Sequence, residues 1–174
     1  TGIITATIIE GNIAALNALT ETGHALLINV TDASAAASAL NTLNAKTTVP
    51  ITVTSTTITG TFADLFTVYT AGAAGTITGL GNEAVTLTDA ITVPQANAIN
   101  ALTTGVVTAT IANTALSDLL DESTPLLDAN SNNAFTITIG TADAEITAAN
   151  LTSLNGLTTV AIDATNVTQI TGTV

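Results

Sequence analysis

The chain has 174 residues, enough for one domain or a short stack of repeats with its own hydrophobic core. It is 47% hydrophobic but only 8% charged and 2% aromatic, it contains no Cys, Met or Trp, and threonine is its most frequent residue. Thirteen acidic residues against one basic residue give a formal net charge of −12, which excludes nucleic-acid phosphates and anionic lipid head groups as partners. No apolar run approaches the roughly 18 residues of a membrane helix, so we expect no membrane insertion.

Internal similarity is the strongest feature of the sequence. One half-unit is a strand-like run, then Asp or a small residue, then an Ala-rich stretch; copies start at Leu26, Ala84 and, more weakly, Phe135. The other half-unit is a Thr-alternating strand followed by a short Leu pattern, with copies that start at Ile4 and Val107 and at residue 51. The full period is therefore a little over 50 residues, and each half-unit is about 25 residues long.

This period predicts a single repeat-built domain over residues 1–174. Its approximate parts are a partial repeat over 1–25, repeats over 26–83 and 84–133, and a partial repeat over 134–174. Because residues 1–9 resemble residues 104–112, we also expect the sequence to begin partway through a repeat.

Within each half-unit the apolar residues change from period two to a period of three or four. Alternating Val, Ile and Thr favour strands, and Leu and Ala at three- and four-residue spacing favour one or two helical turns. In chain order, the expected elements are a strand from residue 4, a helix over 13–19, a strand from 26, a helix over 37–43, a strand over 51–54, a helix over 62–66, a strand from 84, a helix over 96–102, a strand over 107–110, a helix over 116–120, a strand from 135, a helix over 148–154 and a strand fragment from 160.

Polar residues mark where these elements should begin and end. Thr61 before Asp64 and Thr114 before Asp118 are predicted helix caps. Asp residues that follow strands, such as Asp32, are expected to cap the next turn or helix. The glycine-containing segment 70–83 is expected to be a loop insertion in the second repeat.

Strand, turn and short helix in about 25 residues predict an α/β solenoid of parallel strands with short helices and right-handed crossovers. Residues 151–166 carry a leucine-rich-repeat-like rhythm, with Leu at every third position before a strand and an Asn. The alternative is a right-handed parallel β-helix without helices, because Thr-rich runs also suit flat stacked rungs.

The runs ALNTLNAKTTVPITV (39–53) and INALTTGVVTATI (99–111) resemble the Thr- and Ala-rich tandem repeats of very large secreted surface proteins of cyanobacteria and other marine bacteria. The resemblance extends over nearly the whole chain. It implies an extracellular or cell-surface location, in a surface layer, an adhesive fibre or an adhesin, and calcium-binding repeats often accompany such segments.

The residues offer little to an enzyme. His24 is the only imidazole, and it is expected in an exposed turn rather than beside a nucleophile. The chain has no Arg to steady developing negative charge. We therefore expect a non-enzymatic protein with no catalytic residues and no cofactor, apart from a possible calcium ion.

Calcium is the chemical possibility that the residues themselves raise. Segment 121–133 concentrates hard oxygen donors, which calcium selects, and these alternate from Asp128 onward as in a calcium loop. A solvated turn whose side chains cap their own backbone is the alternative. The candidate ligands are Asp121, Glu122, Asp128, Asn130 and Asn132.

Paired threonines on the predicted strands suggest a ligand face. Outward Thr on regular rungs could bind ice or a glycan, whereas the simpler interpretation is that Thr is the solvent-facing strand former of a chain that avoids charge. The candidate residues are Thr5, Thr7, Thr52, Thr54, Thr108, Thr110, Thr136 and Thr138.

The sequence as a whole favours a mechanical function. Residues 1–8 and 167–174 are uncharged and alternate in polarity, and no capping segment is apparent beside them. An uncovered strand edge is a template for further strands. We therefore expect a structural repeat segment that associates with itself through exposed strand ends, either with another copy or with a continuation of the same long chain. An ice- or carbohydrate-binding module is the alternative.

Overall fold

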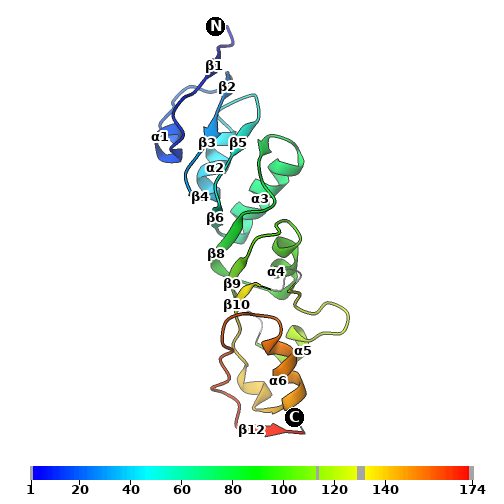
Figure 1. Ribbon diagram of the computed structural model, residues 1–174. Coiled ribbons are helices and arrows are strands. Elements are labelled where there is room, and N and C mark those ends of the chain that lie inside the picture. Colours follow the sequence, from blue (N-terminus) through cyan, green and yellow to red (C-terminus); the bar gives the residue numbers. More distant parts are fainter. Residues whose placement is uncertain (1, 113, 129–131, 173–174) are drawn as a thin grey trace. The chain divides into compact units, whose positions relative to one another are not determined.

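The computed structural model describes residues 2–112, 114–128 and 132–172 (Figure 1). The fold is mixed α/β, with several all-parallel sheets and short interleaved helices, as the sequence predicts at this level. The chain forms two compact units, Thr1–Thr86 and Leu87–Val174. The division lies close to the predicted repeat boundary at residue 83, and each unit is described separately below.

The first unit alternates short strands with helices that lengthen along the chain (Figure 1). Its elements are β1 (Thr5–Thr7), α1 (Ile13–Asn17), β2 (Ala25–Leu27), β3 (Asn29–Val30), β4 (Ser34–Ala36), α2 (Ala37–Asn44), β5 (Ile51–Val53), β6 (Thr57–Gly60), α3 (Phe62–Ala73) and β7 (Ile77–Thr78). Strand β8 (Ala84–Ile91) contains the point at which the units divide.

Parallel pairing stacks each half-unit of the first unit on the next one. β1 pairs with β2, β3 with β5, β4 with β6, and β5 with β7, all in parallel. Thr5 lies opposite Ala25, and Ile51 lies opposite Ile77. The half-unit length seen in the sequence is therefore the spacing of strand partners.

The second unit repeats this plan with longer connections. Its elements after β8 are α4 (Val93–Asn100), β9 (Val107–Ile111), α5 (Leu116–Leu119), β10 (Ala134–Thr136), a 3₁₀ turn η1 (Thr141–Asp143), β11 (Glu145–Thr147), α6 (Ala148–Asn155) and β12 (Gln169–Thr171). β9 pairs with β10, and β11 with β12, again in parallel. Thr108 lies opposite Ala134, so the strand partners of this unit are also one half-unit apart.

Each of the predicted Leu and Ala segments forms a helix. α2 buries Ala37, Leu40 and Leu43, and α3 buries Leu65, Val68 and Tyr69, which is the three- and four-residue spacing of one helical face. The inward residues of β5 and β9 alternate with exposed ones. Leu, Ile and Val from both element types therefore form the core.

Polar side chains tie one half-unit to the next. Asn17 Nδ2 of α1 donates to the carbonyl of Ala39 in α2 at 3.1 Å. Asn41 Nδ2 of α2 makes the equivalent bond to the carbonyl of Asp64 in α3, also at 3.1 Å. Thr54 Oγ1 donates to the carbonyl of Val30 at 2.9 Å. These side-chain donors add a bond to backbone carbonyls of the neighbouring half-unit, and so link successive half-units.

The helix caps agree with the sequence in one case and differ in another. Thr61 caps α3, since its Oγ1 accepts from the backbone N–H of Asp64 at 3.2 Å, so this prediction is confirmed. Thr114 does not cap α5, which is preceded by Ala115, and that prediction is wrong. The backbone N–H of Leu116 donates instead to Asp143 Oδ2 at 2.9 Å, from the following half-unit.

The glycine-containing segment 70–83 is also corrected by the structure. It is not a simple loop insertion, because α3 continues to Ala73 and β7 pairs with β5. Gly79 has φ +87°, and a Cβ at this position would clash with the carbonyl oxygen of Val53. Only glycine can adopt this conformation at such close approach to another backbone, so this residue has a structural reason to be glycine.

Among the described helices, none has the length and apolar character of a membrane-spanning segment.

Candidate functional site

The outer edge of β1 is open within the described part of the first unit. On its inner side, the carbonyl of Ile4 accepts from Ala25 at 2.8 Å and the N–H of Ile8 donates to Leu27 at 2.9 Å. Because backbone groups alternate between the two edges of a strand, those of Thr5 and Thr7 are directed away from β2. This edge is a template for another strand.

Large apolar side chains surround the same edge. Ile9 is 100% exposed and Ile3 is 75% exposed, and Ile4 and Leu27 are more than half exposed. Exposed side chains of this size are individually ordinary, but four of them around one open strand mark a surface suited to contact with another protein segment.

The second unit has an apolar groove beside its last described strand. The groove has a volume of about 610 Å³ and is lined by α6, β12 and the segment that joins them. Ile170 of β12 is 58% exposed in it. The backbone N–H of Gln169 bonds the carbonyl of Ala144 at 3.1 Å, so by strand alternation the backbone groups of Ile170 lie at the outer edge of β12. The lining residues are Ala148, Leu151, Thr152, Asn155, Ala161, Ile162, Ala164 and Ile170.

The α6 face of this groove corresponds to a packed face of α2. The sequences ASALNTLN of α2 and AANLTSLN of α6 align without gaps, so Leu151 and Asn155 match Leu40 and Asn44. Leu40 is fully buried, and Asn44 Nδ2 donates to Thr76 Oγ1, which follows α3, at 3.1 Å. In the first unit this face receives the next half-unit, whereas on α6 it lines a groove.

The predicted calcium loop uses its carboxylates within its own backbone. Asp121 Oδ1 accepts from the N–H of Ser123 at 2.6 Å and from that of Thr124 at 3.0 Å. Hydrogen bonds from the Ser123 hydroxyl and then from these backbone groups lower the pKa of Asp121 below its ordinary value of 3.8. This geometry is that of a side chain that caps its own turn.

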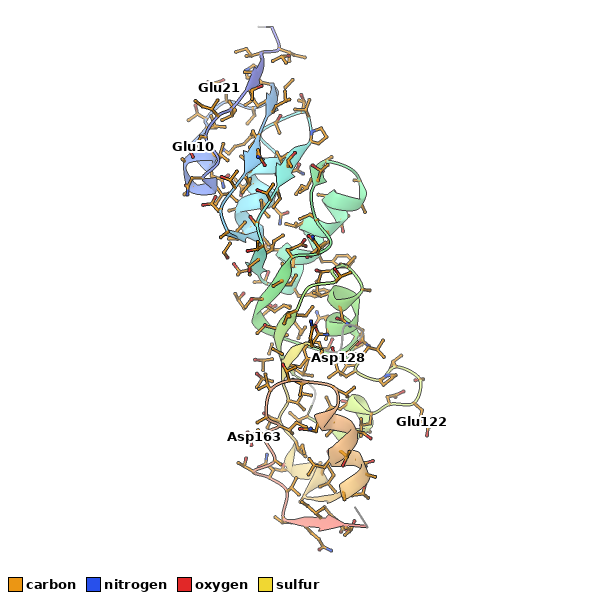
Figure 2. The ribbon with its side chains drawn as sticks, viewed as in Figure 1. Glu10, Glu21, Glu122, Asp128 and Asp163 are labelled. Atoms are coloured by element: carbon orange, nitrogen blue, oxygen red, sulfur yellow. The ribbon has the colours of Figure 1, made fainter. Side chains whose placement is uncertain are left out.

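The other candidate ligands are described only in part. Asp128 Oδ1 accepts from the N–H of Asn132 at 3.3 Å, and Asn130 lies outside the described residues. Figure 2 shows Glu122 and Asp128 well apart along the segment. Asn133 is fully buried. In the ranges described, no three acidic or imidazole side chains are placed to hold a metal ion, so the calcium loop stays a prediction.

The candidate threonines are exposed, apart from the half-buried Thr138, but they do not form one continuous array. Thr110 lies opposite Thr136 on the neighbouring strand. Thr52 lies opposite Thr78, and the Oγ1 atoms of Thr52 and Thr78 are 3.3 Å apart. The other partners differ in chemistry: Thr5 faces Ala25, Thr7 faces Leu27, Thr52 also faces Asn29, Thr108 faces Ala134, and Thr138 forms a bridge with Asp163. Thr54 is used in the bond to Val30 described above.

His24 and Asp32 have structural partners. His24 Nδ1 accepts from the N–H of Ile4 at 3.2 Å. Asp32 Oδ2 accepts from the N–H of Ile13 at 2.6 Å, and its Oδ1 accepts from Asn12 Nδ2 at 2.8 Å. Asp32 therefore caps the helix of the preceding half-unit rather than the following turn.

A polar pocket in the first unit, open to solvent on one side, was not predicted from the sequence. It lies between residues 53–56 and the turn that contains Gly79, and it has a volume of about 390 Å³. Glu83 is 3% exposed and accepts hydrogen bonds from the Tyr69 hydroxyl and, at 2.8 Å, from the N–H of Gly81. One feature of the sequence could have pointed to this pocket, since Glu83 is an acid within a largely uncharged segment. Its partner Tyr69 lies 14 residues earlier, in α3, and no local pattern connects the two residues.

Comparisons of this chain with family models, with curated proteins and with solved structures find no significant match.

Proposed function

We propose that the chain is a structural, non-enzymatic repeat segment of an extracellular or cell-surface protein, in a fibre, a surface layer or an adhesin. In this proposal it is an α/β solenoid in which each half-unit forms one coil, and it associates with itself through exposed strand edges. The partner is another copy or a further half-unit of the same long chain.

Parallel pairing supports the solenoid. In each unit the strands pair with partners one half-unit away, and α1 packs on α2 as α2 packs on α3. Such stacks bury a core between neighbouring repeats, so an outermost repeat needs either a polar cover or a neighbour.

The groove beside α6 is the observation that carries the proposal. Its α6 side matches the face with which α2 receives the next half-unit, and Ile170 of β12 lines the same groove. β1 offers the complementary surface: an open edge with Ile3, Ile4 and Ile9 exposed beside it. Burial of both would remove apolar surface from water and would pair backbone groups that strands otherwise leave open.

The absence of Arg and the structural bond of the single His24 support a non-enzymatic protein. The resemblance to tandem repeats of secreted surface proteins supports the location. The chain also has no Cys, so a stack outside the cell would rely on its hydrogen bonds and core rather than on disulfides.

Light scattering tests the proposal directly. The molar mass of the purified chain is followed over hours, with millimolar calcium in one sample and chelator in the other. We expect the mass to grow, and calcium dependence of that growth would implicate the loop that contains Asp128. A chain that stays monomeric in both samples would contradict self-association.

A pair of variants locates the interface. Ile170→Asp places a charge in the groove and should stop the growth in mass. Ala149→Asp adds the same charge on an exposed position of α6 that does not line the groove, so growth should continue. Equal growth in both variants would show that the groove is not the interface.

The alternative of an ice- or carbohydrate-binding module rests on the pairs Thr110–Thr136 and Thr52–Thr78. A flat ligand surface would need such pairs on successive half-units. The strand partners of Thr5, Thr7 and Thr108 are instead Ala25, Leu27 and Ala134. Thermal hysteresis and glycan-array binding test this alternative, and activity in either that is lost on Thr110→Val would favour it.

A further inference from the structure

The α6 helix leaves uncovered a position that the other α-helices bury. Leu151 stands four residues after the N-cap of α6, is half-buried and lines the groove. Helices α1 to α5 have an apolar residue at the same position, and all of these residues are buried: Leu16, Leu40, Leu65, Ala96 and Leu119. The groove is therefore a seat for a helix that would pack on α6 as α2 packs on α1.

The α1 helix leaves the opposite face uncovered. Ala39 of α2 and Asp64 of α3 stand three residues after their N-caps and are half-buried. Their carbonyls accept the bonds from Asn17 and Asn41, so this side of each helix faces the preceding helix. Ala15 stands at the same position of α1 and is exposed. The first unit thus presents a helix face of the kind that packs on a preceding helix.

These two faces are complementary to each other and not to themselves. In the first unit α1 packs on α2 and α2 packs on α3, while the strands of successive half-units pair in parallel. Two α6 faces, or two α1 faces, would meet in an arrangement that the described helices do not use. A contact between unlike faces can add copies in one direction, whereas a contact between identical faces closes at two copies.

Position 152 distinguishes the face of α6 from the faces that are covered within the chain. Five residues after their N-caps, α1, α2 and α4 carry an Asn whose Nδ2 donates to a carbonyl of the following half-unit. These donors are Asn17 and Asn41, each at 3.1 Å, and Asn97 at 2.8 Å. At the same position α6 carries Thr152, whose Oγ1 donates at 2.9 Å to the carbonyl of Ala148 within the helix. The α6 face therefore lacks the side-chain donor that links one half-unit to the next.

We infer that association is polar, so that the α6 groove of one copy receives the α1 and β1 end of the next copy, and that Thr152 limits the strength of this contact. The inference rests on the proposed function, because it orients the self-association described there. In the contact, α1 covers Leu151 and Ile170, and the carbonyl of Ala15 faces position 152. Because a carbonyl oxygen has two lone pairs, it can accept this bond in addition to the one from its own helix.

Two charge variants test the polarity. Ile9→Asp alters the β1 end at a side chain that is 100% exposed, and Ile170→Asp alters the groove. In analytical ultracentrifugation each variant alone should be monomeric, whereas an equal mixture should form heterodimers and nothing larger, because it holds one unaltered end of each kind. Since each copy carries a net charge of −12, all samples contain enough salt to screen repulsion. Ser38→Asp on α2 and Ala149→Asp on α6 alter exposed positions away from both ends of the contact and should assemble as the unaltered chain does.

The outcomes separate this inference from the proposed function. If the unaltered chain stays monomeric, both fail. If the unaltered chain assembles but the mixture contains only monomers, self-association stands and its polarity is wrong. Dimers of Ile170→Asp alone would show that two β1 ends pair with each other, and dimers of Ile9→Asp alone would show that two grooves do. Either result overturns the inference.

Thr152→Asn tests the position that limits the contact. In the Ile9→Asp chain, whose groove is used in the mixture, it should tighten the heterodimer about threefold to tenfold, the worth of one hydrogen bond. In the Ile170→Asp chain, whose groove is not used, it should change nothing. Ser153→Asn, at an exposed neighbour that does not line the groove, is the matched control. Far-UV circular dichroism checks that each variant folds, and equal affinities with and without Thr152→Asn would overturn the role of Thr152.

Discussion

Replacement of Asn133 by Ala should be one of the most destabilising single changes in the second unit. The side chain of Asn133 is fully buried, its Oδ1 accepts from the N–H of Val107 at 2.9 Å, and its Nδ2 donates to Asn100 Oδ1 at 2.8 Å. Val107 and Asn100 are buried as well. Asn133→Ala therefore leaves one donor and one acceptor unsatisfied, at about 1–3 kcal/mol each.

The expected loss is thus about 2–6 kcal/mol, a large part of the ~5–15 kcal/mol that stabilises an ordinary domain. Equilibrium unfolding in urea, followed by far-UV circular dichroism, measures it from the shift in midpoint. The matched control is Asn132→Ala, an exposed neighbour whose side chain makes no hydrogen bond among those described, which should change stability by less than about 0.5 kcal/mol. A loss below about 1 kcal/mol for Asn133→Ala would refute the reasoning.

Two further changes test the local caps. Asp32→Ala removes the acceptor for the N–H of Ile13 and should destabilise α1 by about 1 kcal/mol, seen as roughly fivefold faster hydrogen exchange there, whereas Glu21→Ala should have no such effect. Hydrogen bonds from the hydroxyl and then the N–H of Thr165 lower the pKa of Asp163, so carboxyl titration by NMR should give a midpoint below 3.8. Since the folded-state pKa is the lower one, the stabilisation by this turn is present above pH 3.8 and is lost as the pH falls through the folded-state value. Thr165→Val should return the midpoint toward 3.8, and an unchanged midpoint would contradict this assignment.

Local periodicity was enough to predict the helices. The Leu and Ala spacing of segments such as 37–43 and 148–154 encodes one buried face, and the strands from 51 and 107 encode strict alternation. The sequence also predicted the spacing of strand partners. The period of its internal similarity is the distance along the chain between paired strands. These features depend on patterns that are visible along the sequence itself.

Partners that come from another half-unit were not predictable in the same way. The cap of α5 is Asp143, 27 residues beyond Leu116, and the bond between Tyr69 and Glu83 joins a helix to a later turn. Such contacts depend on how the half-units stack, which no local pattern specifies. The α3 helix also continues beyond the predicted range 62–66 to Ala73, because Val68 and Tyr69 add a second turn to its buried face.

The bonds between half-units restrict how a chain of this kind can change in length. Asn17 of α1 donates to a carbonyl of α2, and Asn41 of α2 makes the same bond to α3. Removal or duplication of a whole half-unit leaves such an Asn side chain opposite an equivalent carbonyl of the next helix. Insertion of only part of a half-unit moves the Asn side chain away from that carbonyl. Gene duplication could therefore extend such a protein by whole half-units without a new solution for its buried polar groups, and related chains should differ in length by multiples of about 25 residues.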